Sequence, residues 1–480
     1  LYTMHFFFAF TARMWDMGIV LLLSTLSNNN LTLVAFAGFL TNLYVVLFMG
    51  GIGHFLDNTN RLSAAQYALS AKLITVAVAY SICAYIFYNR HEGNDPARDD
   101  NAKLYEYLLY TIPFISASAN LCFSTVSTSV EKDWIVVLAD GDSRWLSNTN
   151  SRMTQIDSGC NAFAPALTGL LFVQFSPSVV AMILLLSNLF STVFLYVFMH
   201  SLYDSWESLA VRQIAPTPST NQSSRTATAN QSNARASETT SLLGKESYKQ
   251  IPEGVMKGVE ESTTTNYGFL TDFMNSGCAG TMIAYAFLYF TVLNFGSLMV
   301  VYLRWCNVSD AWIGAARGAG AFTGLLGATA FPYISNSIGI YRASNLSIIF
   351  QFLLVLIACG SFFFIQNGFG QYAVQVLCIS VLLSRTGLWM FDLGVRQIAQ
   401  ETIPEYCRGK VNGQWKSMTS FFEMAAYIVA GTISDPKNFW VLAVISSVMV
   451  GSATVLFSTT RPDLYYVSTT ACNSEEDELV

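Results

Sequence analysis

The feature that most constrains this chain is a series of twelve apolar segments, each about as long as a membrane-spanning helix. Such a helix needs about 20 mostly apolar residues, because hydrocarbon offers no hydrogen-bond partner to free backbone groups. The segments lie near 3–27, 32–54, 63–88, 104–129, 152–174 and 178–202, and near 268–303, 311–334, 343–366, 370–398, 411–433 and 438–459. The pattern predicts an all-α polytopic membrane protein.

Composition excludes the main alternatives. Only 12% of the residues are charged, whereas a soluble protein carries about 25%. The net charge of −6 without a basic stripe argues against a nucleic-acid partner. Nine Cys in 480 residues are too sparse for a disulfide-stapled scaffold. The P-loop, the nucleophile elbow and the HExxH motif are absent, so we do not expect an enzyme.

The order of the segments predicts two lobes. Six segments lie on each side of a stretch rich in Ser, Thr, Asn and Gln, whose composition predicts a disordered linker. We expect a six-helix N-terminal lobe at 1–203, the linker at 204–266, a six-helix C-terminal lobe at 267–460 and a tail at 461–480. Six plus six around a linker is a two-lobe transporter plan.

Loop charges predict the orientation in the bilayer. Thirteen Lys and Arg residues fall in loops on the side of the linker, against five on the other side. Positive loops stay in the cytosol, so we expect both termini, the linker and the tail to be cytosolic.

The loop after the second segment carries a gate-like motif. It reads from Gly53 to Arg61 and combines a Gly for close helix approach with Asp57 and Arg61. This resembles the loop-2/3 motif of the major facilitator superfamily, in which such charges pair across the lobes. A solvated turn is the alternative. The equivalent second-half loop keeps Gly339 and Arg342 but lacks the acid.

Several strings together resemble the ferroportin family, the iron exporters of animal cells. They are Arg13-Met14-Trp15, Asp57 to Arg61, Lys132-Asp133-Trp134-Ile135-Val136-Val137, Phe287 to Leu293, Arg385 to Leu393, and Arg408-Gly409-Lys410-Val411-Asn412-Gly413. The resemblance implies twelve helices in the major facilitator fold and export of ferrous iron by alternating access. It also implies a plasma-membrane location and no permanently bound cofactor. Five residues match family positions that link the lobes on the cytosolic side: Asp57, Arg61, Asp133, Asn150 and Arg408.

The family's metal ligands are largely replaced in this chain. An Asp and a His flank the Arg-Met-Trp string in the family, and Ala12 and Asp16 stand there. A Cys and a His of the second lobe correspond to Ser297 and Ala426. Because Ser297 removes the thiol on which hepcidin recognition depends, we do not expect a hepcidin-type peptide as a partner.

Polar residues within the first-lobe segments mark a candidate pathway. An ionisable residue in a span is a functional hypothesis by default. Four residues could form an oxygen-rich pocket or could satisfy one another across helix contacts: Asp16, Asp157, Asn161 and Asn188. Lys72 stands where the family has a Gln near a cation, so its ammonium could pair with Asp16 or Asp157 and replace part of the bound charge.

The second-lobe candidates are Asp392, Glu423, Ser297 and Arg385. Arg385 matches a family Arg near the outer gate, and it lies two helical turns from Asp392, which suits a shared network. Glu423 could replace the lost His one turn away, or it could be structural. The string Asn294-Phe295-Gly296-Ser297 predicts a broken helix.

Three functions remain open. The leading hypothesis is export of ferrous iron or another divalent metal, with the metal ion and the lipid bilayer as partners. The second is transport of another cation or a small organic solute, and the third is a non-transporting sensor. The chain has four His residues, and we expect them at interfaces rather than on a metal: His5, His54, His91 and His200.

Overall fold

The computed structural model describes residues 1–26, 31–92, 102–211, 273–274, 276–293, 299, 302–303, 305–308, 310–366, 370–433 and 436–460. In the first half the long helices are α1 (Tyr2–Leu26), α2 (Leu31–Asn58), α3 (Arg61–Glu92), α4 (Ala102–Ser129), α6 (Ser143–Gln174) and α7 (Pro177–Ser205). A π-helix, η2 (Val130–Trp134), leads from α4 into α5 (Ile135–Ala139), and α8 (Glu207–Ala210) follows α7.

The second half is built in the same way. Its helices are α11 (Ala279–Phe287), η3 (Leu288–Phe290), α13 (Asp310–Ile338), α14 (Ile340–Gln366), α15 (Gly370–Thr402), η4 (Glu405–Cys407), α16 (Arg408–Thr432), η5 (Pro436–Asn438) and α17 (Phe439–Thr459). All regular elements in the described part are helical, which confirms the predicted fold class.

Nine of the helices in the described part are long and apolar enough to cross a membrane. Of the other predicted segments, α13 and α16 are 29 and 25 residues long, which suffices to cross the hydrocarbon. Their hydropathy is lower because α13 is rich in Gly and Ala and α16 carries charged side chains. The remaining predicted segment, 268–303, is not one continuous helix.

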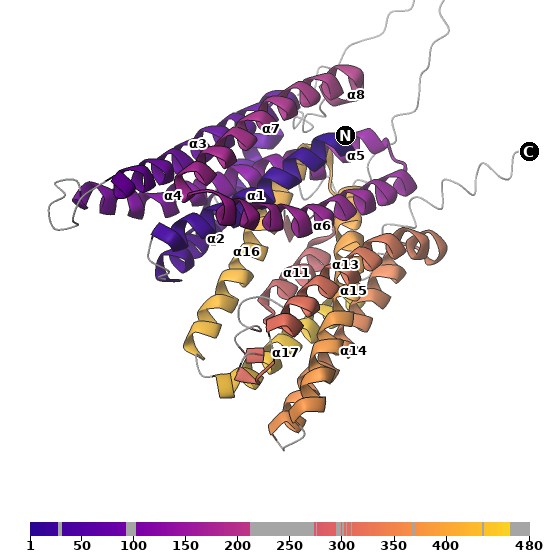
Figure 1. The fold of residues 1–480 in the computed structure, drawn as a ribbon. Helices are drawn as coiled ribbons and strands as arrows, with labels where there is room; N and C mark the ends of the chain where they lie inside the picture. Colours follow the sequence, from indigo (N-terminus) through magenta and orange to yellow (C-terminus); the bar gives the residue numbers. More distant parts are fainter. Residues whose placement is uncertain are drawn as a thin grey trace, which may run out of the picture.

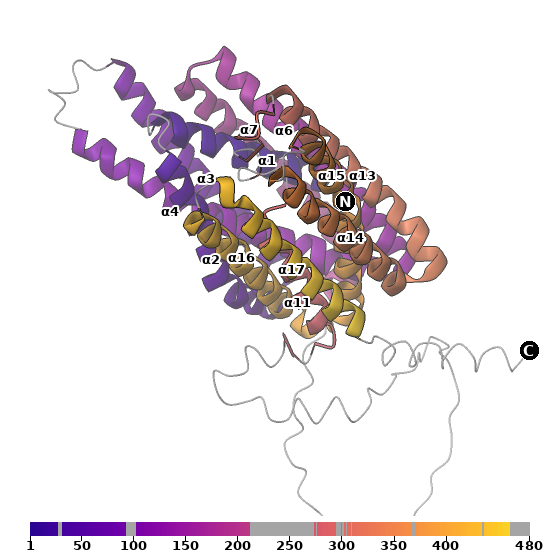
Figure 2. The same ribbon diagram turned by 90° about the horizontal axis from the view of Figure 1, so that it is seen from below.

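The two halves form separate helical groups that meet side by side. Helices α1 to α8 lie together in indigo to magenta, and α11 to α17 form the orange and yellow group (Figures 1 and 2). Helix α2 packs on α16, and α6 packs on α13 and α15. Away from α5 the groups spread apart in Figure 1. Residues 212–266 of the predicted linker and the tail at 461–480 lie outside the described residues, so these two assignments remain predictions.

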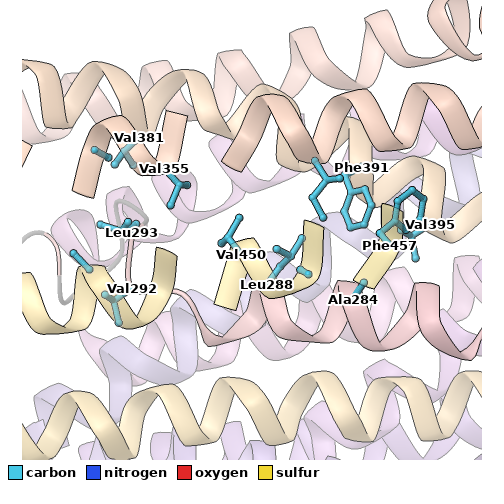
Figure 3. Close-up of a cluster of buried hydrophobic side chains, with 14 of the residues drawn as sticks. Ala284, Leu288, Val292, Leu293, Val355, Val381, Phe391, Val395, Val450 and Phe457 are labelled. Atoms are coloured by element: carbon cyan, nitrogen blue, oxygen red, sulfur yellow. The ribbon is translucent and has the colours of Figure 1, made fainter. Parts of the chain in front are cut away.

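Each lobe has its own apolar core. In the first lobe the rings of Trp15 and Tyr80 meet edge to face at 5.1 Å between centroids. In the second lobe Phe391 and Phe457 pack edge to face at 4.9 Å, within a cluster that α11, α14, α15 and α17 share (Figure 3). Because lipid tails are as apolar as the side chains, close packing rather than exclusion of water holds such helices together.

The seventh predicted segment leaves helical geometry just before the predicted interruption. Helix α11 and η3 end at Phe290, and residues 291–293 are not helical. The freed backbone groups find partners: Val292 donates its N–H to Oγ of Ser446 at 3.0 Å, and the carbonyl of Leu293 accepts from Arg385. The predicted interruption at 294–297, including Ser297, lies outside the described residues.

Candidate functional site: a gate and a pathway between the lobes

The π-helix η2 directs three consecutive charged side chains to different places. Glu131 faces His5 in the first lobe, with 3.9 Å between Oε1 and Nδ1. Lys132 lies over the ring of Trp415 in the second lobe, with its Nζ 4.4 Å from the centroid. Asp133 is buried among cations at the lobe interface. A single π-helical turn within an α-helix often lies at a functional site. Here the turn lets three consecutive charged residues contact both lobes.

Asp133 is the centre of an ion-pair network across the interface. One carboxylate oxygen accepts from Nε of Arg61 at 2.9 Å, and the other accepts from Nη1 of Arg408 at 3.1 Å. Arg61 also pairs with Glu405 of η4. The network therefore joins α3 and η2 of the first lobe to η4 and α16 of the second. Arg61, Asp133 and Arg408 are each less than a tenth exposed, so water screens these pairs only weakly.

Asp57 bonds to the beginning of α16. Its carboxylate accepts the backbone N–H of Gly409 at 2.6 Å and that of Lys410 at 2.7 Å. The first N–H groups of a helix lack partners within the helix, and the helix dipole favours an anion there. A Cβ atom on Gly53 would collide with the carbonyl of Gly409, so glycine allows the approach of α2 that places Asp57.

Asn150 completes the interface. It donates to Oε1 of Gln400 at 2.5 Å, and Gln400 donates to the carbonyl of Glu131 at 2.7 Å. One residue further, Ser151 donates to the carbonyl of Ala328 at 2.6 Å. The structure thus brings all five predicted gate residues to one end of the lobe interface. Their role in gating remains a prediction.

The four polar residues predicted to line an oxygen-rich pocket in the first lobe are Asp16, Asp157, Asn161 and Asn188. No hydrogen bond joins any two of them, so they do not satisfy one another across helix contacts, and the pocket itself remains a prediction. Asp16 is exposed and accepts from Arg13 at 3.3 Å. Asn188 is buried and accepts from Thr192, while Asn161 is exposed. Asp16, Asn161 and Asn188 therefore differ in burial and share no hydrogen-bond partner.

The predicted pairing of Lys72 with Asp16 or Asp157 is wrong. Lys72 is fully buried on α3, and its Nζ has no hydrogen-bond partner. The ammonium instead lies 5.1 Å from the ring centroid of Phe123. The side chain points into the packed lobe rather than toward the acids.

Asp157 has a different partner, His5. Oδ1 of Asp157 lies 3.3 Å from Nε2 of His5, whose side chain is 2% exposed. We expected His5 at an interface, and its burial shows that this expectation was wrong. The apolar sequence around His5 gave no sign of partners that lie on α6 and η2.

In the second lobe Asp392 is buried and has two partners on the protein. It accepts from Nη2 of Arg396 at 3.0 Å and from the hydroxyl of Tyr285. Arg385 bonds to the carbonyl of Leu293 instead. The predicted network between Arg385 and Asp392 is therefore wrong, because Arg385 braces the broken segment.

Several charged residues within the spans of the two lobes interact electrostatically. Asp157 interacts electrostatically with Arg396, and Lys132 interacts with Lys416. Lys416 also interacts with Glu423. Glu423 is half-buried, and no hydrogen bond or ion pair joins it to another of the described residues. In the part of the chain that the structure describes, no group of three or more His, Cys, Asp or Glu is placed to hold a metal ion.

Several residues of this site were missed from the sequence. Arg396 and Lys416 are charges within predicted spans, and the rule that such charges are functional candidates would have found them. Nothing in the sequence indicated a role for Glu405, because its contact with Arg61 depends on how the two lobes pack together.

The comparisons with known proteins agree with this architecture. The family described as Ferroportin1 (FPN1) matches residues 1–450. Solute carrier family 40 member 2 of Arabidopsis thaliana is 26% identical over 470 residues, covering 95% of this chain and 88% of the relative.

Solved structures share the fold. A bacterial homologue of the iron transporter ferroportin, in its outward-facing state with soaked iron, superposes with a TM-score of 0.76 at 20% identity, over 96% of this chain and 98% of that one. The proton:xylose symporter XylE of the major facilitator superfamily superposes with a TM-score of 0.61 at 10% identity, over 96% and 94% of the two chains. The chain is therefore a multi-pass membrane protein with the major facilitator fold, and it belongs to the ferroportin family.

Proposed function

We propose that this protein exports a divalent metal ion, ferrous iron first among the candidates, by alternating access between its two lobes. The observation that carries the proposal is an ion-paired interface between two lobes whose spans each carry carboxylates. Asp157 comes from the first lobe, and Asp392 and Glu423 come from the second. The solved structure named above is a bacterial homologue of the iron transporter ferroportin with soaked iron, which supports iron as the ion to test first.

The interface supplies the means of alternating access. The pair between Asp133 and Arg408 holds one end of the lobes together, and breaking it would let that end open. A site between two rocking lobes is then exposed to one side at a time. The excess of Lys and Arg in the loops at this end supports a cytosolic position for it, and therefore release of the ion on the opposite side.

The ligands that remain favour weak binding of a hard or borderline ion. Carboxylates suit harder ions, whereas thiolates select soft ones. Ala12 and Ala426 remove two positions at which the family has ligands. Weak binding is compatible with transport, because the ion must also leave.

Flux in proteoliposomes tests the proposal. We expect radiolabelled Fe(II) to cross vesicles that contain the purified protein faster than protein-free vesicles. Glu423→Ala should reduce this flux at least severalfold, whereas Glu207→Ala, an exposed acid of α8, should leave it unchanged. Folded wild-type protein without Fe(II) or Co(II) flux would exclude metal transport and favour a sensor.

One observation favours a small organic anion as a second candidate. Lys132 of the first lobe and Lys416 of the second interact electrostatically, and neither ammonium makes an ion pair among the described residues. Two such cations could bind a carboxylate group. Flux of labelled citrate that Lys416→Met abolishes, without any flux of Fe(II), would support this alternative over metal export.

A further inference from the structure

His5 lies buried between carboxylates of two other elements. Its Nε2 is 3.3 Å from Oδ1 of Asp157 on α6, and its Nδ1 is 3.9 Å from Oε1 of Glu131 on η2. The backbone of Met153 also bonds the ring. These contacts enclose the imidazole between α6 and η2.

The contact between His5 and Asp157 is close but is not a well-formed hydrogen bond. Nε2 is buried and makes no hydrogen bond of regular geometry among the described residues, although it interacts with the Asp157 carboxylate, whose oxygen is within 3.3 Å. An unsatisfied buried nitrogen is costly and calls for an explanation. The two atoms are close without forming a regular hydrogen bond, and two ligands of one ion are close in the same way.

The separation of the two atoms fits a shared metal ion. Nitrogen and oxygen ligands lie about 2.0–2.2 Å from a divalent transition metal, so two of them at an angle of 90–110° are about 3.0–3.4 Å apart. The observed 3.3 Å falls within this range. Imidazole together with carboxylate is a donor set for such ions.

We infer that His5 and Asp157 form a two-ligand site for a divalent first-row transition metal, with Glu131 as the positioning residue. The inference rests on the proposed function and names where the first lobe binds its ion. Water would complete the coordination. A ligating His usually hydrogen-bonds a carboxylate or a carbonyl through its other nitrogen. The backbone of Met153 bonds the ring, and the Glu131 carboxylate lies 3.9 Å from Nδ1, close enough to orient it electrostatically.

The surroundings suit an ion that must leave again. The Asp157 side chain is 28% exposed, so an ion can reach the site from its carboxylate side. Arg13 and Arg396 also interact with Asp157, and their positive charges weaken the hold on a cation. Glu131 lies two residues before Asp133, so movement of η2 would connect the site to the gate.

Binding of Co(II) to the purified full-length protein tests the inference. We expect a visible absorption band that saturates with Co(II) concentration. His5→Gln and Asp157→Asn should each weaken binding at least tenfold. His200→Gln is the matched control, because His200 forms an exposed pair with Asp204 at 2.7 Å, and it should change nothing. Glu131→Gln should weaken binding by about 10–100-fold and shift the band, because an outer-shell partner tunes the ligand.

The outcomes separate this inference from the proposed function. Co(II) binding that His5→Gln and Asp157→Asn leave intact in folded protein, or no Co(II) binding by the wild type, overturns the site. Metal flux in those same preparations would leave the proposed function standing. If Co(II) binding depends on His5 and Asp157 but the protein shows no metal flux, the site is supported and the proposed transport function is rejected. If His5→Gln does not fold, Asp157→Asn decides.

Discussion

Asp133 lies 3.1 Å from Arg408, and this ion pair joins the first lobe to the second. The same carboxylate neutralises Arg61. Breaking a buried pair by removing one partner costs about 3–5 kcal/mol, so Asp133→Asn should destabilise the closed interface. We expect spin labels at Arg144 and Ser337, which are exposed, to move apart in double electron–electron resonance.

A matched control is available for this experiment. Asp204→Asn removes an exposed carboxylate that pairs with His200 at 2.7 Å, and exposed pairs contribute little. The distance between the labels should stay unchanged in this variant. An unchanged distance in Asp133→Asn as well would show that the pair between Asp133 and Arg408 does not hold the lobes together.

Asp57→Ala should loosen the contact of α2 with the beginning of α16. The substitution removes the acceptor for two backbone N–H groups, those of Gly409 and Lys410. Losing such a cap costs about 0.5–2 kcal/mol, and Asp57→Asn, which keeps one acceptor, should cost less. Thermal unfolding in detergent measures the difference. Asn58→Ala serves as the control, because Asn58 bonds only to His54 of its own helix; equal losses in both variants would contradict the capping role.

Glycine at position 53 is required by the helix contact, and this can be tested with one added methyl group. A Cβ atom on Gly53 would overlap the carbonyl of Gly409, whereas one on Gly51 would meet nothing within 4 Å. We expect Gly53→Ala to separate α2 from α16 and to lower thermal stability or transport, and Gly51→Ala to do neither. Two indistinguishable variants would mean that the helices can shift without cost.

The sequence predicted the helices and the gate better than it predicted the pathway. Apolar length determines which segments can span a bilayer, and the gate residues lie in short strings with fixed local geometry. The partners of Lys72 and Arg385 depended on how each helix is rotated within its lobe. A shift of one residue turns a helical side chain by about 100°. Such rotations cannot be read from spacing alone, which is why both predicted pairings were wrong.

The same reasoning explains why His5 was misjudged. Its neighbours along α1 are apolar, and its partners, Asp157 and Glu131, are more than a hundred residues away in the sequence. A His near the end of a span more often lies at the membrane interface. Only the packing of α1 on α6 shows that this one is enclosed.

Lys72→Met should stabilise the first lobe. The Lys72 ammonium is fully buried and has no hydrogen-bond partner among the described residues, and the ring of Phe123 lies 5.1 Å from it. An unsatisfied buried polar group costs about 1–3 kcal/mol, and more when it is charged. Methionine keeps most of the volume without the charge, so thermal unfolding should shift upward. Lys103→Met, an exposed position on α4, should leave it unchanged. A downward shift in Lys72→Met would show that the ammonium has a stabilising partner, which is the result expected if the charge stands in for a bound cation.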